Sequence, residues 1–249
     1  MQILLVNDDG YFSEGITKLA NALIGLGHTL VVVAPDRCCS GMGHAETFRK
    51  PIFVKRLHNY EWECYSISGT PCDSVLIGIE LMSKKPPNLI ISGLNNGTNL
   101  GTEIVYSGTV NAAIEGAIRG YRSIALSAEI LNPGDYDYII NIFVTNFELY
   151  LKMLDKTIAI NINYHGTSTS HRGHKIARSG KRNYDERYTV TQDSDGYVFV
   201  LDGMPIEDPR LDVDTTLFDN GYITITPLAC EFTDFQNLAN LENILRGLN

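Results

Sequence analysis

Two adjacent carboxylates near the start of the chain, Asp8 and Asp9, have the residue type and spacing to do chemistry. They stand in the stretch Asn7-Asp8-Asp9-Gly10, directly after the apolar run Ile3 to Val6. Two neighbouring acids repel each other, so a site that gathers both usually also gathers a cation, of which a divalent metal is the simplest. The same residues also suit a turn followed by a helix N-cap, and the tetrapeptide alone leaves both interpretations open.

Further oxygen-bearing side chains follow other predicted strands. Ser40 comes after the second apolar run of the chain, and Asn95 and Asn96 come after the third. The carboxyl ends of parallel strands meet at one edge of a sheet, so we expect these side chains to lie close to the paired acids. No His or Cys cluster competes with the oxygen donors, so the predicted cation is a hard one, such as magnesium, manganese or calcium.

A phosphate site is indicated by Ser107-Gly108-Thr109, which precedes a helix predicted from Val110 to about Arg119. A helix N-terminus flanked by Ser, Gly and Thr offers free backbone N–H groups and hydroxyls, the usual chemistry for holding a phosphate. The glycine-rich segment from Ser92 to Thr102 lies just before it, and its backbone is expected to approach a ligand closely. A plain helix cap without a ligand fits the same residues and stays open as an alternative.

These features together predict metal-assisted hydrolysis of a phosphate ester. A metal with few protein ligands keeps open positions, polarises a phosphoryl oxygen and generates hydroxide near neutral pH. Asp8 and Asp9 are the predicted catalytic residues, which orient or deprotonate the attacking water. The nucleophilic-aspartate pattern, the Gly-x-Ser-x-Gly elbow and the Walker pattern are absent from the sequence. A non-catalytic sensor of nucleotides or phosphosugars that uses the same groups remains an alternative.

The elements that position these residues alternate between strands and helices. Helical spacing from Ile16 to Leu26 ends at Gly27 and separates two buried apolar runs, which makes a βαβ unit with a parallel sheet. The pattern then continues: further strands are predicted at 89–91, 123–127, 158–162 and 222–228, and helices at 70–82, 110–119 and 136–154. The predicted fold class is therefore α/β, a Rossmann-like parallel sheet flanked by helices.

Two hairpins and a terminal helix are predicted outside this core. Residues 51–68 suggest a hairpin at the edge of the sheet, and Asp193-Ser194-Asp195-Gly196 separates two β-rich runs near 188–200. We expect a core of residues 1–164 with 206–230, a β-hairpin extension over 165–205 and a C-terminal helix within 231–249. A hairpin that projects from a compact domain often finds another subunit, so the extension and the helix are expected to serve oligomerisation.

Composition narrows the classes of partner. The net charge of −9 argues against a nucleic-acid polymer, because binding its backbone needs a basic face. No apolar stretch approaches the roughly 20 residues of a membrane span, and Met1 leads straight into a strand, so we expect no membrane contact and a cytoplasmic location. Five cysteines without a Cys-x-x-Cys spacing argue against structural disulfides and zinc.

Several motifs together are specific to one family, and they extend from the first strand almost to the end of the chain. They are Leu4 to Gly10, Ala34-Pro35-Asp36-Arg37 with Ser40-Gly41, Gly69-Thr70-Pro71, Ser92 to Gly101, Tyr106 to Val110, Ala125-Leu126-Ser127 and Gly221 to Leu228. With this combination the chain resembles the SurE survival-protein family of 5'/3'-nucleotidases. Two departures, Cys38-Cys39 and Asn96-Gly97-Thr98, could alter substrate preference without removing the metal.

The resemblance implies a set of residues, a reaction and an assembly. It implies one divalent metal ion per subunit, Mg²⁺ or Mn²⁺, held by Asp8, Asp9, Ser40 and Asn95. It implies a phosphate pocket lined by Asn96, Asn99, Ser107, Gly108 and Thr109. The implied reaction is hydrolysis of nucleoside monophosphates to nucleoside and phosphate, with exopolyphosphatase side activity in some members. The implied assembly is a cytoplasmic homodimer or homotetramer that exchanges its C-terminal hairpin between subunits.

Overall fold

The first strand, β1 (Gln2–Val6), lies in the middle of a sheet because both of its faces are apolar. Ile3 and Leu5 pack into the hydrophobic cluster on one face of the sheet, and Leu4 and Val6 pack into the cluster on the other face. All four side chains are fully buried. A strand buried on both faces is typical of a parallel sheet that helices cover on two sides.

The computed structural model describes residues 1–167, 171–184, 187–206, 208–231 and 233–246. After β1 its first half contains α1 (Glu14–Gly25), β2 (Thr29–Pro35), β3 (Val54–Leu57), β4 (Glu63–Ile67), α2 (Pro71–Leu81), β5 (Leu89–Asn96), the 3-10 helix η1 (Gly101–Val105) and α3 (Gly108–Ile118). Its second half contains β6 (Ser123–Ala128), α4 (Asp135–Thr145), α5 (Phe147–Met153), β7 (Ile158–Tyr164), β8 (His174–Ile176), β9 (Asn183–Tyr184), β10 (Arg187–Gln192), β11 (Tyr197–Asp202), β12 (Pro205–Ile206), α6 (Asp214–Asp219), β13 (Ile223–Ala229) and α7 (Phe235–Arg246).

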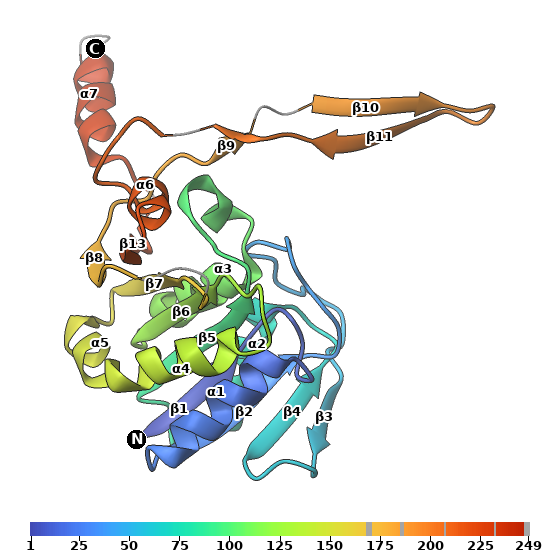
Figure 1. Cartoon of the computed structure of the whole chain (residues 1–249), viewed down its shortest axis with the longest axis vertical. Helices are drawn as coiled ribbons and strands as arrows, with labels where there is room; N and C mark the ends of the chain where they lie inside the picture. Colours follow the sequence, from blue (N-terminus) through green and yellow to red (C-terminus); the bar gives the residue numbers. More distant parts are fainter. Residues whose placement is uncertain (168–170, 185–186, 207, 232, 247–249) are drawn as a thin grey trace.

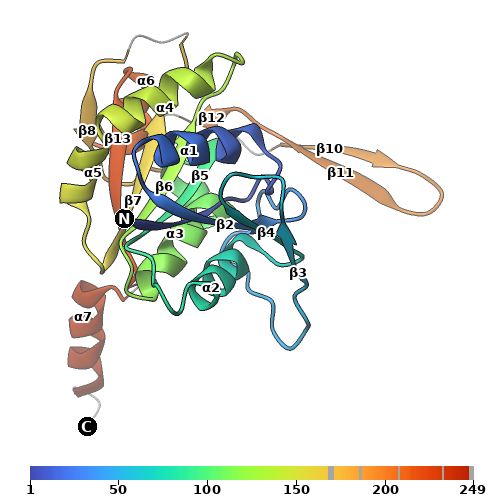
Figure 2. The same cartoon turned by 90° about the horizontal axis from the view of Figure 1, so that it is seen from below.

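The main sheet has the strand order β3-β4-β2-β1-β5-β6-β7-β13-β8 among the described residues. The strands from β4 to β7 run parallel to one another, while β3 and β13 are antiparallel to β4 and β7. Helices α1, α4 and α5 cover one face, and α2 and α3 cover the other (Figures 1 and 2). The predicted α/β class with a largely parallel central sheet is therefore confirmed.

Two elements differ from their predicted bounds. The third core strand does not end at Ile91, because β5 continues to Asn96 through a register shift between Ser92 and Asn95 and keeps its pairing with β6. The helical stretch predicted over 136–154 is divided into α4 and α5 at Asn146. The Asn146 side-chain amide donates to the Ile142 carbonyl at 2.8 Å, a local bond of the kind that competes with helix continuation.

The segments after β7 divide between the body and two projections. Strand β8 joins the main sheet beside β13, although residues 165–205 were expected to form an extension as a whole. Beyond it, β9 pairs with β12, and β10 pairs with β11 to form the predicted hairpin. The hairpin and α7 project from the body in different directions (Figures 1 and 2). None of the described helices is long and apolar enough to cross a membrane.

Helix α1 packs closely on β5 at one glycine. A Cβ atom at Gly15 would lie 2.2 Å from the carbonyl oxygen of Leu94, whereas a Cβ atom at Gly25, at the other end of the same helix, would meet nothing within 4 Å. Backbone atoms in a central strand cannot move cheaply, so Gly15 sets the distance between α1 and the sheet.

We therefore expect Gly15→Ala to lower the free energy of unfolding by about 1–3 kcal/mol or more, because the added methyl overpacks the contact. The matched variant Gly25→Ala should be neutral or stabilising by up to about 1 kcal/mol, because alanine favours the helix. Urea denaturation of both variants measures the difference. Equal stability of the two variants would contradict the close contact at Gly15.

Candidate active site

The N-terminus of α3 meets Asp8, which lies in the turn directly after β1. Ser107 is the N-cap of α3, and its Oγ accepts a hydrogen bond from the Val110 N–H at 3.1 Å. Thr109 donates to the Asp8 carboxylate twice, from its N–H to Oδ2 at 3.2 Å and from its Oγ1 to Oδ1 at 2.5 Å. A Cβ atom on Gly108 would lie 2.9 Å from the Asp8 Cβ, so only glycine permits this approach. The predicted neighbours of Asp8 thus reach it from a distant part of the chain.

The two acids are poorly solvated and close to each other. Burial raises the pKa of Asp8, although the hydrogen bonds from Thr109 oppose this effect. Burial and, next, the negative charge of Asp8 raise the pKa of Asp9 to about 6. The Asn96 backbone N–H donates to Asp9 Oδ2 over a long 3.4 Å. Among the described residues, neither acid forms an ion pair with Lys, Arg or His. The negative charge of the pair is therefore uncompensated.

The loop that carries Ser40 is attached beside Asp8. The Cys39 N–H donates to the Asp8 carbonyl at 2.7 Å, and the Gly43 N–H donates to the Tyr106 carbonyl at 2.9 Å. Ser40 itself is exposed, with its Oγ 3.1 Å from the Cys38 Sγ. The loop after β2 therefore lies between the end of β1 and the start of α3, as the parallel topology requires.

The asparagines of the glycine-rich segment have different surroundings. Asn95 donates its side-chain amide to the Gly97 carbonyl at 2.8 Å, which leaves its Oδ1 without a partner among the described residues. Asn96 is exposed and contacts Asp9 through its backbone. Asn99 is buried, and its amide donates to the Ser127 Oγ at 2.8 Å. The structure thus places the Asn96 backbone, next in sequence to Asn95, beside Asp9, and it ties the Asn99 side chain to β6.

The protein groups predicted to bind a phosphate, in Ser107, Gly108 and Thr109, are not equally available for hydrogen bonds to it. Both donors of Thr109 are directed at Asp8, and the Ser107 Oγ caps the helix. The Gly108 N–H has no hydrogen-bond partner within the described part of the chain, and the Ser107 hydroxyl can still donate its proton. Gly108 and Ser107, at the positive end of the helix dipole, are the groups of this trio that remain for an anion.

Three asparagines support the site without having been predicted. Asn7 donates its side-chain amide to the Gly10 carbonyl at 3.0 Å and to the Ser13 Oγ at 2.9 Å, which fixes the turn that contains both acids. Asn161 and Asn163 each donate to the Asn99 carbonyl, at 2.8 and 3.1 Å. The alternation of asparagine with isoleucine was visible in the sequence, with Asn161 inside the predicted strand 158–162 and Asn163 directly after it. That both side chains face the buried Asn99 carbonyl was not.

The donor set suits a hard divalent cation. Asp8, Asp9, Asn95 and Ser40 supply carboxylate, amide and hydroxyl oxygens, which are ligands that Mg²⁺ and Mn²⁺ accept. The uncompensated charge of the two half- or fully buried acids is the observation that favours a cation at this position. Within the described residues, no group of three or more His, Cys, Asp or Glu side chains is arranged for a metal, so a soft-metal centre has no competing location there.

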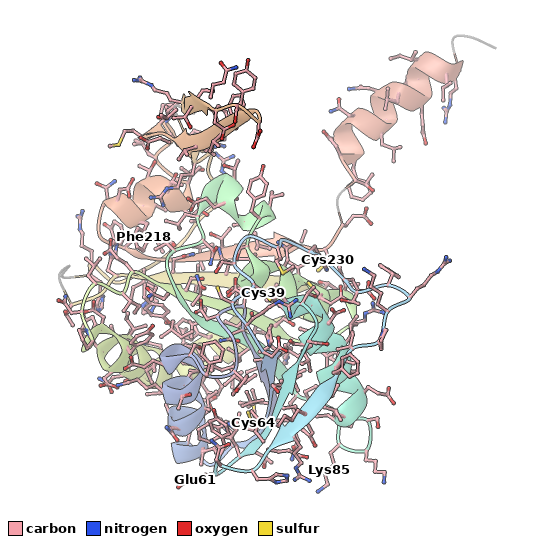
Figure 3. All side chains as sticks on the ribbon, turned by 90° about the vertical axis from the view of Figure 1, so that its right-hand side faces the viewer. Cys39, Glu61, Cys64, Lys85, Phe218 and Cys230 are labelled. Carbon is pink, nitrogen blue, oxygen red and sulfur yellow. The ribbon has the colours of Figure 1, made fainter. Side chains whose placement is uncertain are left out.

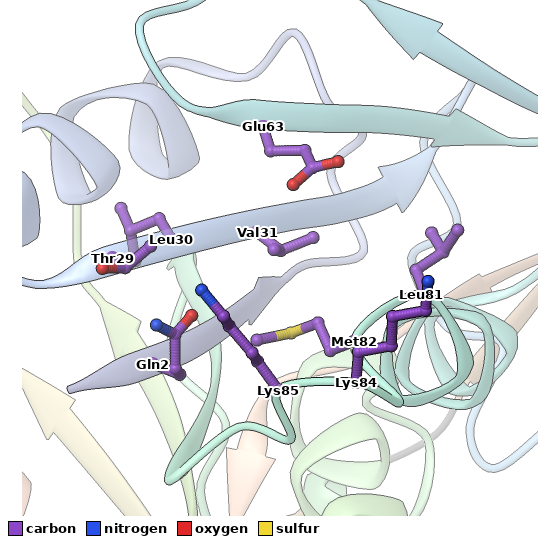
Figure 4. A pocket seen from close by; sticks show the side chains of 9 residues that line it. All are labelled: Gln2, Thr29, Leu30, Val31, Glu63, Leu81, Met82, Lys84 and Lys85. Atoms are coloured by element: carbon purple, nitrogen blue, oxygen red, sulfur yellow. The ribbon is translucent and has the colours of Figure 1, made fainter.

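A cavity of about 290 Å³ lies elsewhere, at the opposite edge of the sheet. Gln2 and Thr29, which begin β1 and β2, line it together with Lys85 from the segment after α2 (Figure 4). Lys85 lies near one end of the body, well separated from Cys39 in the loop after β2 (Figure 3). Because ligands of open α/β sheets bind at the carboxyl ends of the strands, we do not assign this cavity to the active site.

Comparisons with known proteins agree on one family. A family model described as Survival protein SurE matches residues 3–186. The 5'-nucleotidase SurE of Pseudothermotoga lettingae is 37% identical over 253 aligned positions, covering 99% of this chain and 96% of that protein. The 5'-nucleotidase SurE of Synechococcus elongatus is 34% identical, covering 99% and 100%. The crystal structure of the SurE protein from Aquifex aeolicus matches with a TM-score of 0.85 and 35% identity, covering 98% and 99% of the two chains.

The raised pKa of Asp9 predicts how the free energy of unfolding depends on pH. Because folding raises this pKa from its ordinary 3.8 to about 6, the folded state favours the protonated carboxyl. In metal-free protein, the contribution of Asp9 to the free energy of unfolding should be fully present below about pH 4 and lost as the pH rises through about 6. Urea denaturation in EDTA across this range, compared with Asp9→Asn, measures it. Identical pH profiles for the two proteins would show that the pKa is not raised.

Proposed function

The chain belongs to the survival protein SurE family, and on that premise we propose that it is a 5'-nucleotidase that hydrolyses nucleoside monophosphates to nucleoside and phosphate. The observation that carries the proposal is the pair of the buried Asp8 and the half-buried Asp9, which has no positive partner in the described part of the chain and lies beside the N-terminus of a helix. An anionic phosphate and two carboxylates share such a place only with a cation between them. Side activity on polyphosphate stays a prediction.

One divalent metal ion per subunit, Mg²⁺ or Mn²⁺, is part of the proposal. Asp8, Asp9, Asn95 and Ser40 are the residues that would hold it. Such an ion supplies a Lewis acid that polarises a phosphoryl oxygen and lowers the pKa of water bound to it. The Oδ1 of Asn95 supports this assignment, because it has no partner among the residues that the structure describes, whereas the amide nitrogen of the same side chain donates to Gly97.

The phosphate group is proposed to bind at the start of α3. The Gly108 N–H and the Ser107 hydroxyl are the donors available there, and the dipole of α3 favours a negative charge at this end. Asn96 lies on the same rim, with its backbone bonded to Asp9 and its side chain exposed. Asn99 and Thr109 act indirectly in this arrangement, since their donors hold Ser127 and Asp8.

The two acids have different roles in the proposed reaction. Asp8 is fixed by two hydrogen bonds from Thr109 and serves as a rigid carboxylate. Asp9 is less buried than Asp8 and accepts one long hydrogen bond, from the Asn96 N–H at 3.4 Å, among the described residues. We assign Asp9 to orient the attacking water and to accept its proton, because its carboxylate keeps acceptor positions that the hydrogen bonds of Thr109 occupy in Asp8.

We also propose that the chain assembles as a homodimer or homotetramer through its two projections. Strands β10 and β11 expose aromatic and aliphatic side chains, among them Tyr188, Phe199 and Leu201. Helix α7 exposes Phe235 and Leu241 among its apolar residues. A contiguous apolar surface on an element that leaves the body is typical of a protein interface.

Asp8→Asn and Asp9→Asn should each retain the fold and lose phosphate release from AMP by about a thousandfold or more, several kcal/mol in the barrier. Asp155→Asn is the control, because Asp155 is an exposed acid before β7, at the other edge of the sheet. Phosphate release is measured with manganese and then with EDTA. Full activity in either Asn variant would refute the assigned roles, and AMP binding without any turnover in the wild type would favour a sensor.

Removal of the hairpin should abolish assembly. Replacing residues 187–202 with a short Gly-Ser linker leaves the body of the sheet intact, because β10 and β11 pair only with each other within the described chain. Light scattering coupled to size exclusion should then report a smaller species than the wild type. An unchanged number of subunits in the oligomer would show that the hairpin is not needed for the interface.

A further inference from the structure

One buried carboxylate has no part in the proposed chemistry. Glu115 lies on α3 and is only 6% exposed. Its Oε2 lies 2.8 Å from the His44 Nε2, and its Oε1 accepts from the Arg119 Nε at 2.7 Å. Because a carboxylate accepts, the His44 Nε2 is the donor. A buried carboxylate is costly unless its oxygens are satisfied, so both partners matter for its burial.

The two partners of Glu115 come from different places. Arg119 stands one helical turn later on α3, so its contact stays within one helix. His44 belongs to the segment between β2 and β3, which also carries Ser40. The His44 contact therefore joins a loop without regular secondary structure to a helix that is packed on the sheet.

The same loop is attached at further points on either side of His44. Before it, Cys39 and Gly43 donate to the carbonyls of Asp8 and Tyr106. After it, the Ala45 carbonyl accepts from the Thr70 Oγ1 at 2.6 Å, and Thr47 donates to Asp73 from its N–H and its Oγ1. His44 thus stands where the loop passes from the active-site rim to the start of α2.

The distance along α3 excludes direct participation of Glu115 in the reaction. Glu115 stands seven residues after Gly108, roughly 10 Å along the helix at about 1.5 Å per residue. A helix is rigid over this length, so a group fixed to Glu115 is also fixed relative to the helix N-terminus. Ser40 stands four residues before His44 and inherits this constraint.

We propose that His44 and Glu115 are positioning residues, which hold the Ser40 loop against α3 so that Ser40 and the N-terminus of α3 keep a fixed separation. The inference rests on the proposed function, because it concerns the metal and phosphate groups of the same site. It assigns a role to a histidine that sequence alone could not distinguish from a surface residue.

The test compares three variants of the full chain. His44→Ala removes the donor, His44→Gln keeps an amide that can donate to Glu115, and Arg119→Gln removes the other partner of Glu115 without touching the loop. His44→Ala should speed hydrogen exchange of residues 38–47 and should weaken Mn²⁺ binding and raise the KM for AMP by about tenfold, the effect of one hydrogen bond to a charged group. His44→Gln should recover most of this loss, and Arg119→Gln should stay within about twofold of the wild type.

The outcomes separate this inference from the proposed function. Unchanged hydrogen exchange in His44→Ala, or equal effects of His44→Ala and Arg119→Gln on the loop, would overturn it. If His44→Ala does not fold, the test compares the hydrogen-exchange rates of residues 38–47 in His44→Gln and Glu115→Gln. Only Glu115→Gln places an uncharged acceptor opposite His44, so only this variant should exchange faster than the wild type in the loop. Hydrogen exchange needs neither metal nor substrate, so it judges the positioning role even if the wild type releases no phosphate from AMP.

Discussion

The contact between Asp8 and Thr109 is the interaction on which the rest of the site depends. It joins the first strand to the third helix, across 101 residues of sequence, and Gly108 permits it by having no side chain. The contact brings an acid to a helix N-terminus, where a negative charge is favoured. It also occupies the N–H and the hydroxyl of Thr109. The phosphate site that we propose at the start of this helix therefore depends on Ser107 and Gly108.

The site concentrates negative charge at a stability cost. Asp8 and Asp9 lose solvation on folding and repel each other, and no described basic side chain offsets either of them. Elsewhere in the chain buried acids are satisfied, as Asp135 is by backbone and side-chain donors of Thr167 and by the N–H groups of Leu131 and Asn132. Burial also raises the pKa of Asp214, although three backbone N–H groups donate to its carboxylate. Asp8 and Asp9 differ from both acids because two carboxylates stand side by side and repel each other.

Local patterns predicted most of the fold because they are local in origin. The apolar run of β1, the cap at Ser107 and the turn at 193–196 act within a few residues, and the structure has each of them. Contacts between residues that are distant in the sequence could not be predicted from it. Residues Ser92 to Asn96 resemble a loop in composition, yet pairing with β6 keeps them in a strand, since neighbouring strands override propensity. The direction of Thr109 toward Asp8, and of Asn99 toward Ser127, likewise depends on partners that only folding brings together.

The two edge strands of the main sheet, β3 and β8, are its shortest strands. They span Val54–Leu57 and His174–Ile176, and the first carries Lys55 and Arg56. Short edges that bear positive side chains present few unpaired backbone groups and repel copies of themselves. Addition of further strands at β3 or β8, which could continue into a fibril, is thereby disfavoured. Self-association is left to the β10–β11 hairpin, which closes on itself through its turn, and to helix α7.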